Sequence, residues 1–335
     1  AYFVRAYCHF ELFRLYGSLP YIDKVMGSED EWDLPRLSDY DMLQRIAADF
    51  QTAADIFDQA GLMRRDPASG SGHLAATDQD KPNGVTALAM KGRALLYSAS
   101  PLSNPGNDIS RWEEAAEANW TALKSALDHG YLLLAKEKYT DNFYGTKYTN
   151  EHIWAWNYGS SKINTGTWSG TFAYPASNYT NGSGDCPTQN FVDRFETLDG
   201  DPLLTEADRE AAAKLGHYDE QDPYSNRDPR FDKTILHDGS VVSGCPTGIN
   251  IHYDPATGTY PVTSLNNNNR SFGIAWGSND SKGYSNTGYY VNKLWNGMLG
   301  TSAAHQHTDP LIRMAELYLN YAEAVAELGT ITQND

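Results

Sequence analysis

Basic residues are scarce in this sequence. Its 335 residues include 26 Lys and Arg against 43 Asp and Glu, which gives a formal net charge of −17 at pH 7. Proteins that bind nucleic acid neutralise its phosphates with a basic surface, so we expect no nucleic-acid partner. The acidic balance also disfavours anionic ligands, although a local pocket of Lys and Arg would outweigh a net charge.

Long apolar runs are missing too. No run approaches the roughly 20 residues that a membrane-spanning helix needs, and the mean hydropathy is −0.57. The chain does not start with the basic and apolar stretches of a secretory signal. Residues 1–5 already have the pattern of a helix interior. We therefore expect a fragment of a longer chain, in which case targeting signals lie upstream.

Cysteine is limited to three residues. Cys8 lies in a helical pattern, where we expect a small core residue. Cys186 and Cys245 each precede a proline in a Gly/Ser-rich loop; a disulfide between them is one alternative and would require an oxidising exterior. The sequence has no CxxC and no Cys/His quartet with zinc spacing, and we expect no metal site and no cofactor.

Tyrosine, by contrast, is abundant. The 22 Tyr outnumber the 11 Phe, and aromatic residues make up 12% of the chain. Phenol hydroxyls suit a surface that stacks on ligands and hydrogen-bonds to them. Half-buried structural positions are the alternative, and composition alone does not decide between the two.

Helical periodicity is confined to the first third of the chain and its last part. Apolar spacing and end signals predict five helices. The first ends at Gly17, the second begins at Ser38, the third follows Asn83, the fourth ends near Gly130 and the last begins after Pro310. Ala89 and Gly92 are small enough to let a neighbouring helix approach closely. Long helices joined as hairpins are typical of helical-repeat folds, although no clean 34-residue repeat aligns.

The middle of the chain is rich in Gly, Asn, Ser and Thr, which indicates loops with short strands. We therefore predict a mainly α protein, in which tetratricopeptide-like helix pairs form a scaffold for a long irregular region. Its three parts form one compact domain, truncated at both ends: residues 1–138 are helical, residues 139–309 form the variable ligand-binding region, and residues 310–335 return to the scaffold. Within the variable region, Ile153-Trp154-Ala155-Trp156 alternates like a strand with one buried face.

Four segments in order resemble the SusD/RagB family of outer-membrane nutrient-binding lipoproteins of Bacteroidetes. The first contains Arg14-Leu15-Tyr16-Gly17-Ser18-Leu19-Pro20, and the second contains Lys91-Gly92-Arg93. The full segments are residues 5–20; 87–102; 187–200 with 226–231; and 287–293 with 310–324. The resemblance implies the helical scaffold, a lid-like partnership with a SusC-like TonB-dependent transporter, and a location on the outer membrane facing outwards. The family's lipid-bearing Cys and its final helical region do not occur in this sequence, so we expect membrane contact only through a lipid anchor that lies outside it.

Ligand stacking is expected from aromatic residues in polar loops, because sugar rings present C–H faces that stack on aromatic rings while Asn, Asp and Arg bond their hydroxyls. Related proteins often place such aromatics in the loop after the first motif helix. The candidates are Trp32, Trp168, Tyr174, Tyr179, Trp276 and Tyr284.

Other groups have a structural alternative that we favour. Glu196 and Asp199 have the composition of a glycosidase carboxylate pair, but an acidic chain produces such pairs by chance. The string His305-Gln306-His307-Thr308-Asp309 resembles a metal-binding HxHxD and lies in a polar loop. Arg227, Asp228 and Arg230 are expected to tie loops to the helical scaffold.

The sequence therefore predicts non-catalytic binding of a glycan at the cell surface for delivery to the transporter. Two alternatives stay open: a helical glycoside hydrolase that uses a Glu/Asp pair, and a protein-interaction scaffold without sugar binding.

Overall fold

The computed structural model describes the chain except for residues 65–79, 144–147, 158–185, 242–286, 294–307 and 331–335. The chain divides into two compact units. Unit 1 comprises Ala1–Leu134, Tyr148–Trp156 and Asp309–Asp335, and unit 2 comprises Ala135–Lys147 and Asn157–Thr308. Each unit is described by itself below.

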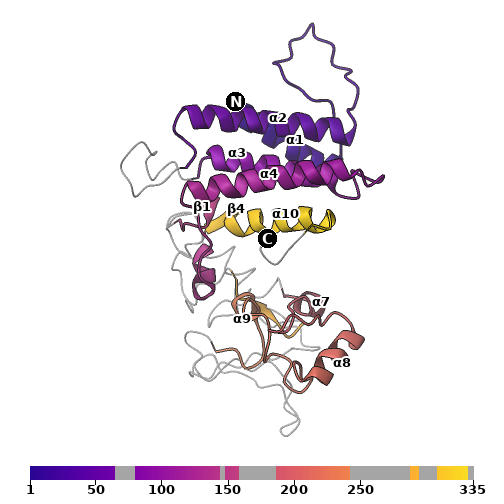
Figure 1. The fold of residues 1–335 in the computed structure, drawn as a ribbon, viewed down its shortest axis with the longest axis vertical. Coiled ribbons are helices and arrows are strands. Elements are labelled where there is room, and N and C mark those ends of the chain that lie inside the picture. Colours follow the sequence, from indigo (N-terminus) through magenta and orange to yellow (C-terminus); the bar gives the residue numbers. More distant parts are fainter. Residues whose placement is uncertain (65–79, 144–147, 158–185, 242–286, 294–307, 331–335) are drawn as a thin grey trace, which may run out of the picture. The chain divides into compact units, whose positions relative to one another are not determined.

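Unit 1 is a bundle of long helices (Figure 1). Side-chain caps account for three of the helix starts: Ser38 Oγ accepts from the Asp41 N–H at 3.0 Å, Asn83 Oδ1 from Thr86 N–H at 2.9 Å, and Asp108 Oδ1 from Ser110 N–H at 3.1 Å. The helices predicted from periodicity are confirmed. They are α1 (Tyr2–Tyr16), α2 (Asp39–Gln59), α3 (Gly84–Ala99), α4 (Ile109–Asp128) and α10 (Met314–Glu327).

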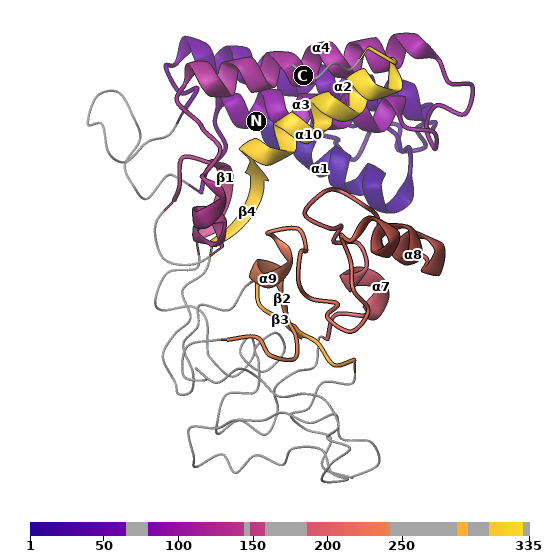
Figure 2. The ribbon, with the colours of Figure 1, turned by 60° about the horizontal axis from the view of Figure 1, so that its bottom comes forward.

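Helix α3 is the centre of unit 1, and both α2 and α4 pack against it. Gly92 makes the approach of α4 possible, because a Cβ at this position would lie 2.4 Å from Asn119 Oδ1. The Asn119 amide in turn donates to the Gly92 carbonyl oxygen at 3.1 Å. Helix α10 packs against α4, on the side away from α2 in Figure 1, and Figure 2 shows it crossing the bundle obliquely. The predicted scaffold of packed helix pairs is therefore confirmed.

Two groups of buried side chains hold unit 1 together. The larger includes Phe10, Met42, Ile46, Phe50 and Met90, all fully buried. The second includes Leu95 and Trp112, with Val325 of α10. Burial of each large apolar side chain contributes about 1.5–3 kcal/mol, so the two groups join all the long helices into one core.

Unit 1 also contains two short strands. Strand β1 (His152–Asn157) pairs with β4 (Thr308–Arg313), which leads directly into α10 (Figure 2). The predicted strand at 153–156 is confirmed, since Ile153 and Ala155 are buried while Trp156 is 52% exposed. The start predicted for the last helix was wrong. Residues after Pro310 continue as strand as far as Arg313, and a two-stranded sheet tolerates the missing N–H of Pro310 at an edge.

Unit 2 contains shorter elements around a small core. They are the 3₁₀ helix η2 (Lys136–Asn142), α7 (Gln189–Val192), α8 (Glu206–Leu215), α9 (Phe231–Thr234) and the antiparallel pair β2 (Ile235–Leu236) and β3 (Tyr290–Val291). Phe231, Ile235 and Tyr289 form its buried centre with Val192.

Helix α8 was not expected in a region read as loops and strands. Thr205 and Asp208 form a full capping box at its start, and Gly216 closes it with φ 77°. Both signals stand in the sequence. None of the helices in the described ranges has the length and hydropathy of a membrane span.

Candidate ligand-binding site

Trp32 lies in the long connection between α1 and α2. The connection begins at Gly17, whose φ of 73° ends α1 and whose N–H donates to the Phe13 carbonyl oxygen at 2.8 Å. It ends at the cap residue Ser38. Within it, the Trp32 side chain is 64% exposed. A large aromatic ring left in water is available for stacking on a ligand.

Hydrogen bonds hold the Trp32 ring within its turn. Its indole Nε1–H donates to the Gly27 carbonyl oxygen at 3.1 Å. The Gly27 N–H donates to Asp30 Oδ2 at 2.7 Å, and Lys24 Nζ donates to Asp30 Oδ1 at 2.5 Å. The bonds from Lys24 and from Gly27 N–H lower the pKa of Asp30 below its ordinary value. We name residues 17–37 the Trp32 loop.

An ionic network attaches the Trp32 loop to the helices. Arg5 of α1 makes a bidentate pair with Asp49 of α2, through Nε at 2.5 Å and Nη2 at 2.7 Å. Its third nitrogen, Nη1, donates to the Asp23 carbonyl oxygen at 2.7 Å. Tyr21 adds an O–H bond to Asp49 Oδ2 at 2.7 Å. Burial favours protonation of Asp49, but the bonds from Arg5 and Tyr21 outweigh it and lower the pKa of Asp49.

The Trp32 loop combines a stacking face with hydrogen-bond acceptors. Carboxylates precede and follow the ring in Glu29-Asp30-Glu31-Trp32-Asp33. Some carboxylate oxygens close the turn itself, since Glu31 Oε1 accepts from the Asp33 N–H at 2.9 Å. An exposed ring can stack on the C–H face of a sugar, and carboxylates that neighbour it in sequence can accept bonds from the sugar hydroxyls.

The other aromatic candidates lie outside the described residues. They are Trp168, Tyr174, Tyr179, Trp276 and Tyr284. Their role in ligand stacking stays a prediction. Of the aromatics that precede them, Phe143 is buried, and Trp154 packs edge-on against Phe3 and Tyr7 with ring centroids 5.5 and 5.3 Å apart. These two rings are therefore used in packing within the protein.

The cysteine predictions have different outcomes. Cys8 was expected in the core, but it is exposed, because it lies on the outer face of α1 between Val4 and Leu12, which are also exposed. Cys186 is half-buried, and Cys245 lies outside the described ranges. The disulfide between Cys186 and Cys245 therefore stays a prediction.

The carboxylates considered for catalysis are solvent-exposed. Both Glu196 and Asp199 are exposed, and Asp199 Oδ2 accepts a long bond of 3.4 Å from the Asn226 amide. Glycosidases raise the pKa of one of the two carboxylic acids by placing it in an apolar environment. Neither residue has such an environment.

The charged motif residues tie loops together, but within unit 2. Arg227 is 9% exposed, and its guanidinium donates to the carbonyl oxygens of Val192, Phe195 and Pro223 at 2.8–2.9 Å. Arg230 pairs with Asp228. We expected bonds to the helical scaffold; the three bonds of Arg227 instead join segments of unit 2, so its role is structural there.

The metal-like string at 305–309 lies largely outside the described residues. Residues 305–307 are not described, while Thr308 and Asp309 begin β4. Among the described ranges, no group of three or more His, Cys, Asp or Glu side chains has the arrangement of a metal site.

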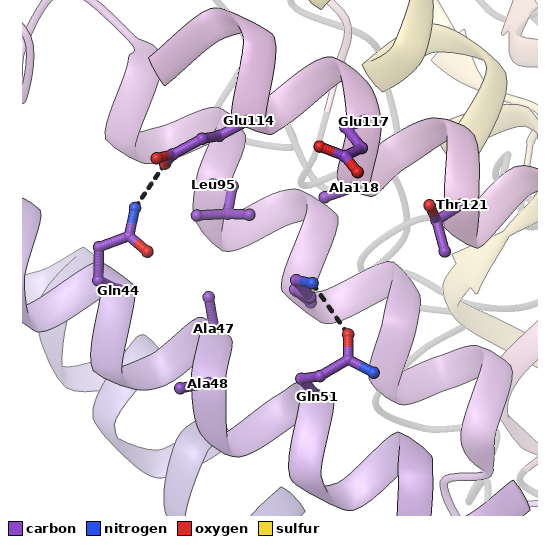
Figure 3. A pocket seen from close by; sticks show the side chains of 10 residues that line it. Gln44, Ala47, Ala48, Gln51, Leu95, Glu114, Glu117, Ala118 and Thr121 are labelled. Atoms are coloured by element: carbon purple, nitrogen blue, oxygen red, sulfur yellow. Dashed lines mark hydrogen bonds between the residues drawn. The ribbon is translucent and has the colours of Figure 1, made fainter. Parts of the chain in front are cut away.

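A groove that the sequence did not predict crosses α2, α3 and α4 (Figure 3). Its volume is about 380 Å³, and Ala47, Ala48 and Ala118 line it with Leu95. Its polar side chains bond to one another across the helices, Gln44 Nε2 to Glu114 Oε2 at 2.6 Å and Lys91 Nζ to Gln51 Oε1 at 2.9 Å. The three alanines were the only sequence signal. None of the described residues that line the groove is aromatic, so these residues offer no stacking face.

Comparison with known proteins identifies the family. The model of the SusD family matches residues 150–333, which is more than half of the chain. The chain therefore belongs to the SusD family. No curated protein matches the chain.

Solved structures show the same fold. A SusD-like protein from Bacteroides fragilis NCTC 9343 is 25% identical with a TM-score of 0.62, covering 98% of this chain and 57% of that protein. A SusD-like carbohydrate binding protein from the same strain is 20% identical with a TM-score of 0.64, over 99% and 55%. A structure with xylogluco-oligosaccharide is 17% identical with a TM-score of 0.52, over 96% and 52%. The chain thus spans little more than half the length of these relatives.

Proposed function

We propose that this chain binds glycans at the bacterial cell surface without cleaving them. The observation that carries the proposal is Trp32, a ring 64% exposed and held by its indole N–H to the Gly27 carbonyl oxygen. An ordered ring loses little conformational freedom when a sugar stacks on it. Membership of the SusD family and the similarity to a SusD-like carbohydrate binding protein from Bacteroides fragilis support the same function.

Neutral polysaccharides are the favoured ligands. The chain carries a formal charge of −17. Four carboxylates, those of Glu29, Asp30, Glu31 and Asp33, lie within three residues of Trp32 in the sequence. A uronate or sulfated sugar would meet repulsion there. The aromatic residues at 168, 174, 179, 276 and 284 are proposed to extend the stacking surface. Delivery of the glycan to a SusC-like TonB-dependent transporter, on the outer face of the outer membrane, completes the proposal and rests on family membership alone.

A binding screen tests the proposal directly. The purified chain would be run by affinity electrophoresis through gels that contain one soluble polysaccharide each, with xyloglucan among the neutral ones and polygalacturonate among the anionic ones. A reducing-sugar assay on the same mixtures detects cleavage. We expect retardation by at least one neutral polysaccharide and no new reducing ends. New reducing ends would favour the hydrolase, and no retardation by any polysaccharide would contradict glycan binding.

A further inference from the structure

His9 contacts the Trp32 loop from inside α1. The side chain is buried, with 8% of its surface exposed. Its Nδ1 lies 2.9 Å from the Arg5 carbonyl oxygen, and its Nε2 lies 3.0 Å from the backbone nitrogen of Ile22. The ring also stacks on Tyr21, with centroids 4.0 Å apart and an interplanar angle of 21°.

These two partners fix the protonation state of the ring. A carbonyl oxygen only accepts, so Nδ1 must carry a hydrogen. A backbone N–H only donates, so Nε2 must keep its lone pair. The contacts are satisfied together only by the neutral imidazole with its proton on Nδ1. An imidazolium would turn an N–H towards the N–H of Ile22.

A continuous chain of contacts leads from His9 to Trp32. Ile22 precedes Asp23, whose carbonyl oxygen Arg5 holds at 2.7 Å. The next residue, Lys24, pairs with Asp30, which holds the Gly27 N–H. Gly27 then accepts from the Trp32 indole. The anchor at Ile22 is therefore the start of the segment that fixes the Trp32 ring.

We propose that His9 is a positioning residue of the Trp32 loop, and that it acts in its neutral form, so that protonation of its imidazole releases the loop at Ile22 and weakens ligand binding at Trp32. The ligand part of this inference rests on the proposed function. The release of the loop does not.

The charges around His9 nearly balance one another. Arg5 of α1 carries a positive guanidinium, and Asp49 of α2 carries a negative carboxylate. The loop contributes the neutral phenol of Tyr21 and the backbone carbonyl of Asp23. Arg5 and Asp49 are paired with each other at 2.5 Å. The main effect of protonating His9 is therefore that the Ile22 N–H loses its acceptor. Histidine is the side chain that ordinarily changes charge between about pH 5 and 8.

Hydrogen exchange of the Ile22 amide in the ligand-free chain tests the release. After correction for intrinsic exchange rates, we expect protection to fall about 5- to 100-fold between pH 7.5 and pH 5, the range that an unsatisfied buried donor implies. Amides of α3 serve as the internal control and should not change. Equal protection of Ile22 at both pH values would overturn the inference.

Two variants separate positioning from simple packing. In His9→Gln the amide can still donate to Arg5 and accept from Ile22 but does not titrate, so protection should be kept at pH 5. In His9→Ala protection should be low at both pH values. If His9→Gln showed the wild-type pH dependence, the inference would fail. If His9→Gln did not fold, as judged by circular dichroism, the wild-type comparison at pH 7.5 and pH 5 would decide alone.

The ligand arm repeats affinity electrophoresis at the two pH values with the polysaccharide retarded at pH 7.5. We expect wild-type retardation to weaken at pH 5 and His9→Gln retardation to stay constant. Loop release without any glycan binding would overturn the proposed function and the ligand part alone. Glycan binding that is identical at both pH values in the wild type would overturn the link from His9 to Trp32.

Discussion

Arg93 and Glu316 form a bidentate ion pair across 223 residues of sequence. Arg93 Nε lies 2.6 Å from Glu316 Oε1, and Arg93 Nη2 lies 2.7 Å from Glu316 Oε2. The same Nη2 donates to the Leu311 carbonyl oxygen at 3.1 Å. The pair joins α3 to the β4–α10 segment, and each partner lies in one of the segments that resemble the SusD/RagB family. This motif pair attaches the two elements to each other.

A second pair joins motif segments within unit 2. Tyr289 O–H donates to Gln189 Oε1 at 2.8 Å, and these residues belong to the fourth and third segments. In the first segment, Arg5 holds Asp49 and the Asp23 carbonyl. These motif residues make contacts between elements, which is the structural role that we expected for Arg227, Asp228 and Arg230.

Removal of Arg93 should destabilise the fold. The two side chains are only 20% and 25% exposed, so Arg93→Ala leaves a poorly hydrated carboxylate and should lower the free energy of unfolding by about 2–3 kcal/mol. Arg93→Lys cannot keep both bonds and should cost about 1–2 kcal/mol. Urea unfolding measures both. Lys124→Ala is the control, because it removes an exposed ion pair with Asp128 and should change the free energy of unfolding by less than about 0.5 kcal/mol. Equal losses for Arg93→Ala and Lys124→Ala would contradict a stabilising role of the Arg93–Glu316 pair.

Gly92→Ala should strain the contact between α3 and α4. The added Cβ would lie 2.4 Å from Asn119 Oδ1, and Asn119 is buried and bonded to two backbone carbonyls. Its side chain has little room to move, so we expect a loss of about 1–3 kcal/mol. Gly106→Ala, which meets nothing within 4 Å, is the matched control. Thermal unfolding that ranks Gly92→Ala equal to or above the wild type would show that the close approach is not required.

Stability should fall in acid through Asp49. Because the pKa of Asp49 is lowered in the folded chain, the unfolded chain binds more protons as the pH falls below the ordinary Asp value of about 3.9. The stabilisation from Asp49 is thus complete above that value and is lost as the pH falls through the folded pKa. Asp49→Asn should be less stable at neutral pH, and its curve should approach the wild type only as the pH falls below about 4 in urea unfolding. If the free energies of unfolding of the wild type and Asp49→Asn changed in parallel with pH, groups other than Asp49 would cause the loss of stability in acid.

Helices and their ends could be predicted from the sequence, because their signals are local. Ser38 and Gly130 occupy the expected start and end positions, with a cap bond from Asp41 N–H at 3.0 Å and a Gly130 φ of 77°. Gly92 was expected to admit a neighbouring helix, and Asn119 shows which one. These features depend on a few adjacent residues or on one missing side chain.

Features that depend on distant partners could not be predicted. Residues 308–313 form a strand because β1 pairs with them. The local sequence of these residues does not predict that pairing. Cys8 is different: it lies four residues from each of the exposed residues Val4 and Leu12, so helical spacing already placed it opposite the buried face of α1. For the site, Trp32 could be identified as a candidate from its polar loop, but the bonds of Gly27, Arg5 and His9 that hold the loop join positions which sequence spacing does not relate.

The proposed function requires that Trp32 stacks on a glycan. Isothermal titration calorimetry of the wild type, Trp32→Ala and Trp120→Ala, with an oligosaccharide of the polysaccharide that the screen selects, tests it most directly. Trp120 is the matched control, a ring 48% exposed that lies on α4 beside Tyr321. Loss of one stacked ring corresponds to about 0.5–1.5 kcal/mol beyond the buried area, so we expect Trp32→Ala to weaken binding about tenfold with unchanged stability, and Trp120→Ala to bind like the wild type. Wild-type affinity in Trp32→Ala would contradict the account.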